Sequence, residues 1–232
     1  MDFALLTMDG FLFILRWIHF IFGIIWIGHL YYFNFTQGPF FNETDATTKS
    51  NAIQKLVPRA LWWFRWGAMF TFLSGLLMLM IRGHQNVNLF MTAWGVSILI
   101  GSTLATIMWA NVWFVIWPKQ KLVIQNAVQT ATGGAAIPEA AAAGARAMVA
   151  SRTNVLFSIP MLFFMGAASH LPLSVRTLNF WPLAIVVGLI VGLLELNALK
   201  GKVGPMASVK GVIHSGVGLA LVLYVVTELL TK

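Results

Sequence analysis

The chain has 232 residues, of which 59% are hydrophobic and 9% are charged, and its mean hydropathy is +0.81. Soluble domains carry about 25% charged residues, so this composition excludes a water-exposed globular protein and indicates an integral membrane protein. Cysteine is absent, which excludes disulfides, iron–sulfur clusters, thiolate catalysis and covalently attached c-type haem. The net charge of +8 is assigned to basic cytoplasmic loops and not to a nucleic-acid partner.

Six apolar segments are long enough to cross about 30 Å of hydrocarbon as helices. We expect the spans at about residues 11–35, 61–82, 91–117, 154–171, 181–199 and 211–229. The longest connection, residues 118–153, contains an alanine-rich piece that is either a plain linker or a short helix beside the membrane. The prediction is an all-α, polytopic membrane bundle of about six transmembrane helices, forming a single transmembrane domain over residues 1–232.

The distribution of lysine and arginine predicts which side of the membrane each loop faces. With the N-terminus outside, eleven of the fifteen basic residues fall on the inner side. The four that fall near the outer side are Arg16, Arg82, Arg176 and Lys232. Because cytoplasmic loops carry the excess of basic residues, we expect both termini to lie outside.

Histidines are the chemically informative residues of these spans. The chain has five: His19, His29, His84, His170 and His214. All but His84 lie in or at the ends of predicted spans, where ionisable residues are costly and mark function. Imidazole is the commonest axial ligand of haem iron. A glycine four residues from each of His19, His170 and His214 lies on the same helical face and leaves room for a flat porphyrin.

Depth in the membrane predicts how the histidines pair. His29, late in the first span, and His214, early in the last, both lie near the inner side and are predicted to share one haem b. His19 precedes His29 by about 15 Å of helix and is predicted to share a second haem with His170, near the outer side. Arg16, one turn outward from His19, is expected to neutralise a haem propionate.

Alternatives to these assignments stay open. His84, in the polar turn RGHQNVN, is interpreted as a solvated loop residue, although it could also partner His19. A copper or zinc site is disfavoured because neither carboxylates nor cysteines accompany the histidines. Glu195 is either a proton relay or an interfacial partner of Lys200.

Further polar residues occur near the inner side of the predicted bundle. Asn111 lies late in the third span, and Arg152 and Asn154 open the fourth. Together they could line a pocket for an anionic or quinone-like ligand. Alternatively, they are a snorkelling arginine and ordinary polar residues at helix ends.

Three stretches of this chain resemble the membrane domain of the bacterial membrane-bound urate oxidases, or urate hydroxylases. These are GIIWIGHLYYFNF at 23–35, NVWFVIWPKQK at 111–121 and SRTNVLFSIPMLFFMGAASH at 151–170, within a resemblance that covers about 11–230. It implies a multi-pass protein of the bacterial inner (cytoplasmic) membrane that passes electrons from urate oxidation to the respiratory chain. Fuller family members carry a C-terminal cytochrome c domain. This chain has no Cys-x-x-Cys-His motif, so either a separate cytochrome c accepts the electrons or the chain has kept this fold for another redox task.

The sequence thus predicts a haem b electron-transfer protein of a respiratory redox system, with one or two haems in a lipid bilayer. The substrate is urate if the resemblance extends to function, or else a quinone. Oxidoreductase activity is left open, and no catalytic residue is assigned. The alternative is a non-catalytic accessory subunit that packs against a larger membrane complex.

Overall fold

The computed structural model describes residues 3–171, 173–175 and 180–231, and within these ranges the regular structure is helical, without strands. The long helices are α1 (Met8–Tyr31), α4 (Val57–Gln85), α5 (Ala93–Ala110), α6 (Trp117–Ala131), α7 (Ala140–His170), α8 (Phe180–Lys200) and α9 (Val209–Leu230). They supply six segments long and apolar enough to cross a membrane. The prediction of an all-α membrane bundle with about six spans is confirmed.

Two spans are longer than predicted because π-helical segments extend them. α1 continues through the first π segment, Tyr32–Gln37, into α2 (Gly38–Glu43). α5 continues through the second π segment, Asn111–Ile116, into α6. The first and third spans therefore reach 36 and 39 residues. Short 3-10 turns also occur, at Ala4–Leu6, Val87–Met91 and Gly204–Ala207.

Short polar side chains set the starts of several helices. Asp45 caps α3 (Ala46–Lys55), where its carboxylate accepts a hydrogen bond from the Thr48 backbone N–H at 2.9 Å. The Thr48 hydroxyl also donates to this carboxylate, and these hydrogen bonds hold the pKa of Asp45 below its usual value. Thr7 and Thr92 cap α1 and α5 in the same way. These caps explain why the chain turns sharply into each helix.

The region 118–153 is more helical than the sequence indicates. α6 extends to Ala131, and α7 begins at Ala140. Residues 140–150 of the alanine-rich piece form the first turns of α7, in keeping with the high helix propensity of alanine, and not a separate helix beside the membrane. The connection is thereby reduced to residues 132–139.

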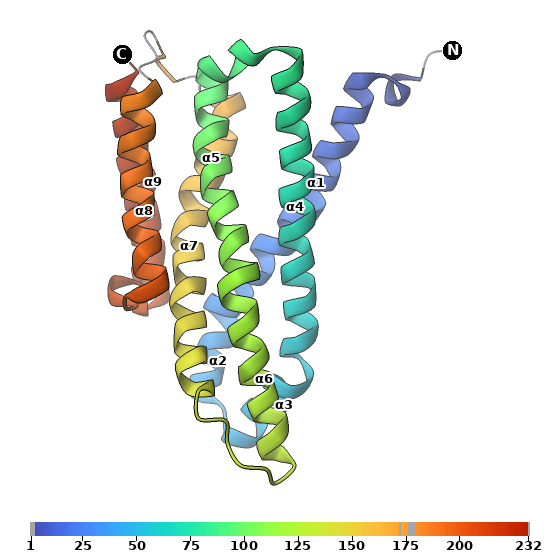
Figure 1. The fold of residues 1–232 in the computed structure, drawn as a ribbon, viewed down its shortest axis with the longest axis vertical. Coiled ribbons are helices and arrows are strands. Elements are labelled where there is room, and N and C mark those ends of the chain that lie inside the picture. The colour runs from blue at the N-terminus through green and yellow to red at the C-terminus, as the bar shows by residue number, and fades with distance from the viewer. Residues whose placement is uncertain (1–2, 172, 176–179, 232) are drawn as a thin grey trace.

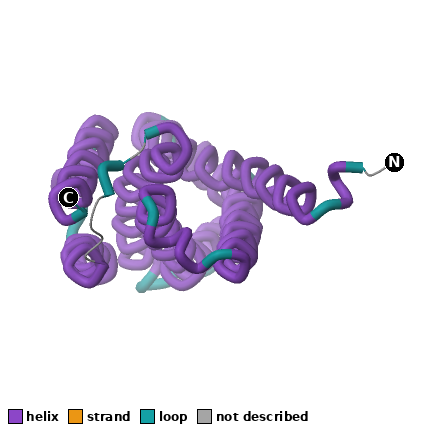
Figure 2. Tube along the Cα trace, turned by 90° about the horizontal axis from the view of Figure 1, so that it is seen from above, coloured by secondary structure: helices purple, strands orange, loops and turns teal. Residues whose placement is uncertain are grey.

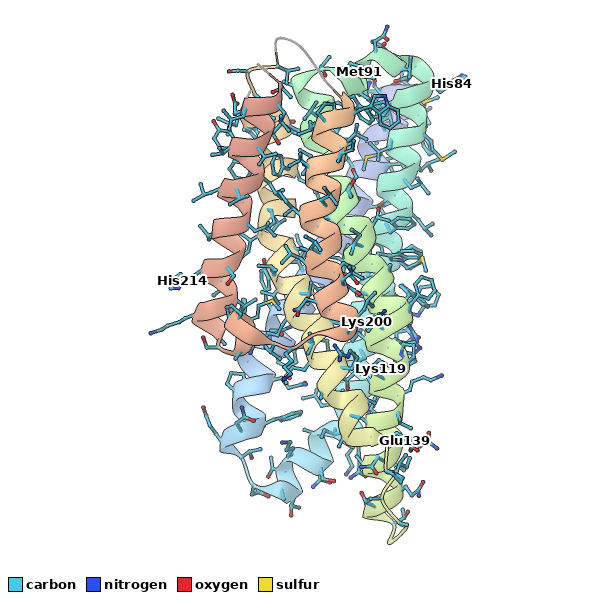
Figure 3. The ribbon with its side chains drawn as sticks, turned by 60° about the vertical axis from the view of Figure 1, so that its left-hand side comes forward. His84, Met91, Lys119, Glu139, Lys200 and His214 are labelled. Atoms are coloured by element: carbon cyan, nitrogen blue, oxygen red, sulfur yellow. The ribbon has the colours of Figure 1, made fainter. Side chains whose placement is uncertain are left out.

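α7 is the central helix, with α5 and α6 packed on one side and α9 and α8 on the other. α1 packs along α4, but its N-terminal half diverges from the bundle (Figures 1 and 2). Both termini lie at one end of the bundle, here called the terminal end, as an even number of spans requires. The opposite end, which carries α3 and residues 132–139, is called the loop end. Lys119 and Lys200 lie toward the loop end and His84 at the terminal end (Figure 3).

The membrane side that each end faces stays a prediction. The count of basic residues assigns the loop end to the inner side. Two of the four basic residues assigned to the outer side, Arg176 and Lys232, lie outside the described residues.

Candidate functional site

A cavity of about 930 Å³ lies between the α1–α4 pair and the α5–α7 pair. All four helices line it, and the lining residues of α4 and α5 fall within 71–82 and 94–106, which places it in the terminal half of the bundle. Its wall is mainly apolar. The polar or charged side chains that line it are Arg16, His19, Thr71, Arg82, Ser102, Thr106 and Ser169.

His19 is the only imidazole among the lining residues, and its hydrogen bonding fixes the tautomer. Its Nδ1 atom lies 3.2 Å from the Ser74 hydroxyl oxygen. The Ser74 oxygen also lies 2.6 Å from the Phe70 carbonyl oxygen and 3.1 Å from the Thr71 carbonyl oxygen. Because a carbonyl can only accept and the hydroxyl has one proton, we assign that proton to a carbonyl and the acceptor role toward His19 to the serine oxygen. The Nδ1 atom of His19 therefore carries the proton, and Nε2 keeps a lone pair that can bind a metal.

Glycines give this imidazole and the cavity their room. A β-carbon at Gly75 would lie 3.0 Å from the Cε1 atom of His19, so the ring packs directly on the α4 backbone. Gly28 also lines the cavity, and a β-carbon there would meet nothing within 4 Å. The small residues near His19 therefore come from α4 as well as from α1.

Two guanidinium groups lie nearer the terminal end than His19. Arg16 is exposed and lies one helical turn from His19 on α1. Arg82 is half-buried and lies about 10 Å beyond Gly75 along α4. The cavity is thus cationic at its terminal end and apolar deeper in the bundle, which suits an amphipathic ligand with an anionic edge.

The other predicted ligands lie outside this cavity lining. His29, half-buried on α1, directs Nδ1 at the Ile25 carbonyl oxygen at 2.7 Å. His214 is exposed and points away from the bundle (Figure 3). His170 is exposed at the end of α7, next to the lining residue Ser169. Of the predicted set, His19 and Arg16 line this cavity, whereas His29, His170 and His214 are not among its lining residues.

A polar layer lies nearer the loop end, where each π segment directs an asparagine toward α7. Asn34 Nδ2 donates to the Ser151 hydroxyl at 2.8 Å. Asn111 Nδ2 donates to the Asn154 amide oxygen and to a Glu195 carboxylate oxygen, each at 3.0 Å. These hydrogen bonds connect the first π segment to α7 and the second to α7 and α8, and such interhelical bonds stabilise membrane bundles. They favour a structural role for the predicted cluster of Asn111 and Asn154.

Two arginines in the same half of the bundle have unusual surroundings. Arg152 is 8% exposed, and its Nη1 atom is buried without a hydrogen bond to any described residue. It does not join Asn154, since residues two apart face different sides of a helix. Arg65 instead lies over the Trp117 ring, with its guanidinium carbon 3.9 Å from the ring centroid, and near Trp113 at 5.1 Å. This cation–π contact joins α4 to α6.

The fold and the cavity define a class: a multi-pass membrane bundle with a largely apolar pocket, partly open at its rim, that presents one imidazole. Within the described residues, no group of three or more histidine, cysteine, aspartate or glutamate side chains is placed to hold a metal ion. The groups of the cavity lining that could bind a metal are one imidazole, hydroxyl groups and the thioethers of Met78, Met161 and Met165, and two guanidinium groups lie near its terminal end.

Residues 87–197 match the family described as Urate oxidase N-terminal. The match confirms the resemblance to the membrane domain of urate oxidases over this part of the chain, which is just under half of it. It includes the α5–α7 wall of the cavity and the polar layer of Asn111, Asn154 and Glu195, whereas His19 precedes it. Neither a curated protein nor a solved structure matches the chain.

Sequence reasoning missed three residues of this site. Arg82 was assigned only to the outer side of the membrane. Its position near the outer end of the second span matches that of Arg16 in the first span, and this similarity could have indicated that it belongs to the site. Ser74 and Gly75 gave no such signal, because a serine and a glycine are ordinary in a membrane helix.

Proposed function

We propose that this chain is a membrane electron-transfer protein that binds haem b in the terminal-half cavity, where His19 would hold the iron. One observation carries the proposal. The Nδ1–H group of His19 is engaged by Ser74, which leaves Nε2 free in an apolar cavity. Metal-bound histidines characteristically donate their other ring N–H group in this way.

The chemistry of the cavity fits a haem. Its apolar wall is suited to a porphyrin, and the glycines at positions 28 and 75 leave space where side chains would intrude. Arg16 and Arg82 would bind the two propionates by charge-assisted hydrogen bonds. When bound, a haem b supplies one-electron redox chemistry. The chain would hold the iron through His19, keep water away with the apolar wall, and neutralise the anionic edge.

Urate is the electron source that the family match favours, and a separate cytochrome c is the proposed acceptor. A quinone is the other candidate partner. The matched residues 87–197 support the link to urate, whereas the imidazole evidence comes from α1 and α4, which precede the match. The haem and the urate link therefore rest on different parts of the chain and can fail separately. The family's setting supports a place in the bacterial inner membrane.

One observation favours the second candidate function, an accessory subunit of a larger membrane complex. His214 is exposed on α9 and points away from the bundle, although ionisable residues in membrane helices usually face protein or water. A neighbouring subunit packed on α9 would supply such a surface. It would also supply a partner for the predicted inner haem ligand, which a single chain leaves outside the bundle.

The test is purification after expression with haem supplied, followed by oxidised and reduced absorption spectra and a pyridine haemochrome assay. We expect a b-type spectrum, and loss of the haem in the cavity on the change His19→Ala. His84→Ala is the matched control, since His84 is exposed at the terminal end. Correctly folded wild-type protein that stays colourless would overturn the haem proposal and favour the accessory subunit.

A further inference from the structure

We infer that Met165 would hold the haem iron together with His19, from the other wall of the cavity. The inference rests on the proposed function and adds a residue that neither the histidine pattern nor the family match assigns. It begins from the two walls of the cavity. His19 lies on the α1–α4 side, where it contacts Gly75 and Ser74. The α5–α7 side facing it carries two methionines, Met161 and Met165.

His19 and Met165 lie at similar depths in the bundle. The imidazole of His19 packs on Gly75, ten residues before the end of α4. The side chain of Met165 packs on Gly101, eight residues after the start of α5. At 1.5 Å per residue these positions lie about 15 Å and about 12 Å from the terminal ends of their helices. Because a short turn joins α4 to α5, the two contacts differ in depth by less than one helical turn.

Met165 is less buried than Met161. Met161 is 6% exposed and belongs to the packed core, whereas Met165 is partly buried and packs against that core. The Cγ, Sδ and Cε atoms of Met165 lie 3.1–3.3 Å from where a β-carbon on Gly101 would be, so the thioether packs closely on the α5 backbone. To bind iron, the side chain would have to turn its sulfur away from this contact, which the three rotatable bonds of a methionine allow.

Other candidates for the second ligand are placed less well. Met78 also lines the cavity, but it lies one turn beyond Ser74 on α4, on the same side as His19. Ser102 and Ser169 offer hydroxyl groups. The protein groups that bind haem iron are imidazole, thiolate, thioether and phenolate groups, so these serines are poor candidates. His170 is exposed at the end of α7 and is tested below as the predicted alternative.

This ligand has a functional consequence. A methionine with a histidine raises the reduction potential of a haem relative to two histidines. The chain would therefore hold a haem suited to accept electrons from a moderate donor and to reduce a high-potential acceptor. Such a haem matches the proposed transfer to a c-type cytochrome.

The experiment compares haem-loaded wild-type protein with the variants Met165→Leu, Met161→Leu and His170→Ala. The measurements are magnetic circular dichroism and electron paramagnetic resonance of the ferric protein, carbon monoxide binding by the ferrous protein, and a redox titration. We expect the histidine–methionine signature in the wild type. Met165→Leu should lose it, become high-spin, bind carbon monoxide and titrate at a lower potential. Met161→Leu and His170→Ala should retain the wild-type behaviour.

The outcomes separate this inference from the proposed function. A wild-type protein that binds no haem overturns the proposed function, and the ligand assignment with it. A protein that binds haem with a bis-histidine signature lost in His170→Ala overturns Met165 alone, as does loss of the signature in Met161→Leu. Met165→His provides a further check, because a correct assignment predicts six-coordinate haem with a potential below that of the wild type. Haem that stays five-coordinate in that variant counts against the assignment.

Discussion

Replacing Ser74 with alanine tests the hydrogen bond that fixes the imidazole of His19. Loss of a partner that orients a metal-binding histidine costs about 10- to 100-fold in affinity. The distance from Nδ1 to the serine oxygen is 3.2 Å, at the long limit for an N–H···O bond. We therefore expect the lower limit, about tenfold weaker haem binding, or about 1.4 kcal/mol.

The assay is the rate at which a soluble haem-scavenging protein removes haem from each variant. Ser74→Thr keeps a hydroxyl group and should retain wild-type affinity. Ser97→Ala is the matched control, since Ser97 is 0% exposed and its hydroxyl makes no hydrogen bond to a described residue. If Ser74→Ala holds haem as tightly as the wild type does, the hydrogen bond does not orient a ligand and the reasoning from the tautomer is wrong.

Three further predictions concern the cavity and the polar layer. Gly75→Val should abolish haem binding and leave the helix content unchanged, because a side chain there would displace the imidazole of His19. The measurements are the amount of haem per chain and the circular dichroism spectrum. A full haem content would contradict the prediction. Asn154→Leu should destabilise the bundle by about 1–3 kcal/mol, because this 0% exposed residue leaves buried partners unpaired; an unchanged thermal unfolding curve in detergent would count against the structural role of the layer. Arg152→Met should be neutral or stabilising, because it removes a buried Nη1 atom that has no hydrogen-bond partner among the described residues. Arg146→Met should destabilise the protein, because it removes two hydrogen bonds to backbone carbonyl oxygens, at 2.9 and 3.2 Å. An unfolding temperature lower for Arg152→Met than for Arg146→Met would refute the comparison.

Much of the fold followed from hydropathy, because each span is a nearly continuous apolar run and lipid leaves the backbone few alternatives to a helix. The ends were less predictable. The third span continues through Asn111 into α6, since no glycine or proline occurs between Asn111 and Trp117, and Pro118 lies where the π segment passes into α6. The extension of α7 back to Ala140 was also missed, because helix propensity continues where hydropathy falls.

The candidate site was only partly predictable, for a geometric reason. Sequence spacing relates residues on one helix, and Arg16 and His19, one turn apart on α1, both line the cavity. Which helices face one another is decided by packing, and the pairing of α1 with α4 brought Ser74 and Gly75 to His19. Depth alone could not show that His214 lies on an outward face of α9. Two histidines at equal depth can still lie on opposite sides of a bundle.

The two π segments make the first and third spans unusually permissive toward change in length. A π turn accommodates one residue more than an α turn between the same flanking helices. Loss of one residue within 32–37 or 111–116 could thus be absorbed by reversion to an α-helix, with the helices on either side staying in phase. Elsewhere in a span the same deletion would rotate the following helix by about 100°, since an α-helix has 3.6 residues per turn. Such a deletion would turn the side chain of Asn34 or Asn111 away from α7. A homologue that lacks one residue there would therefore keep the bundle and lose a hydrogen bond to α7.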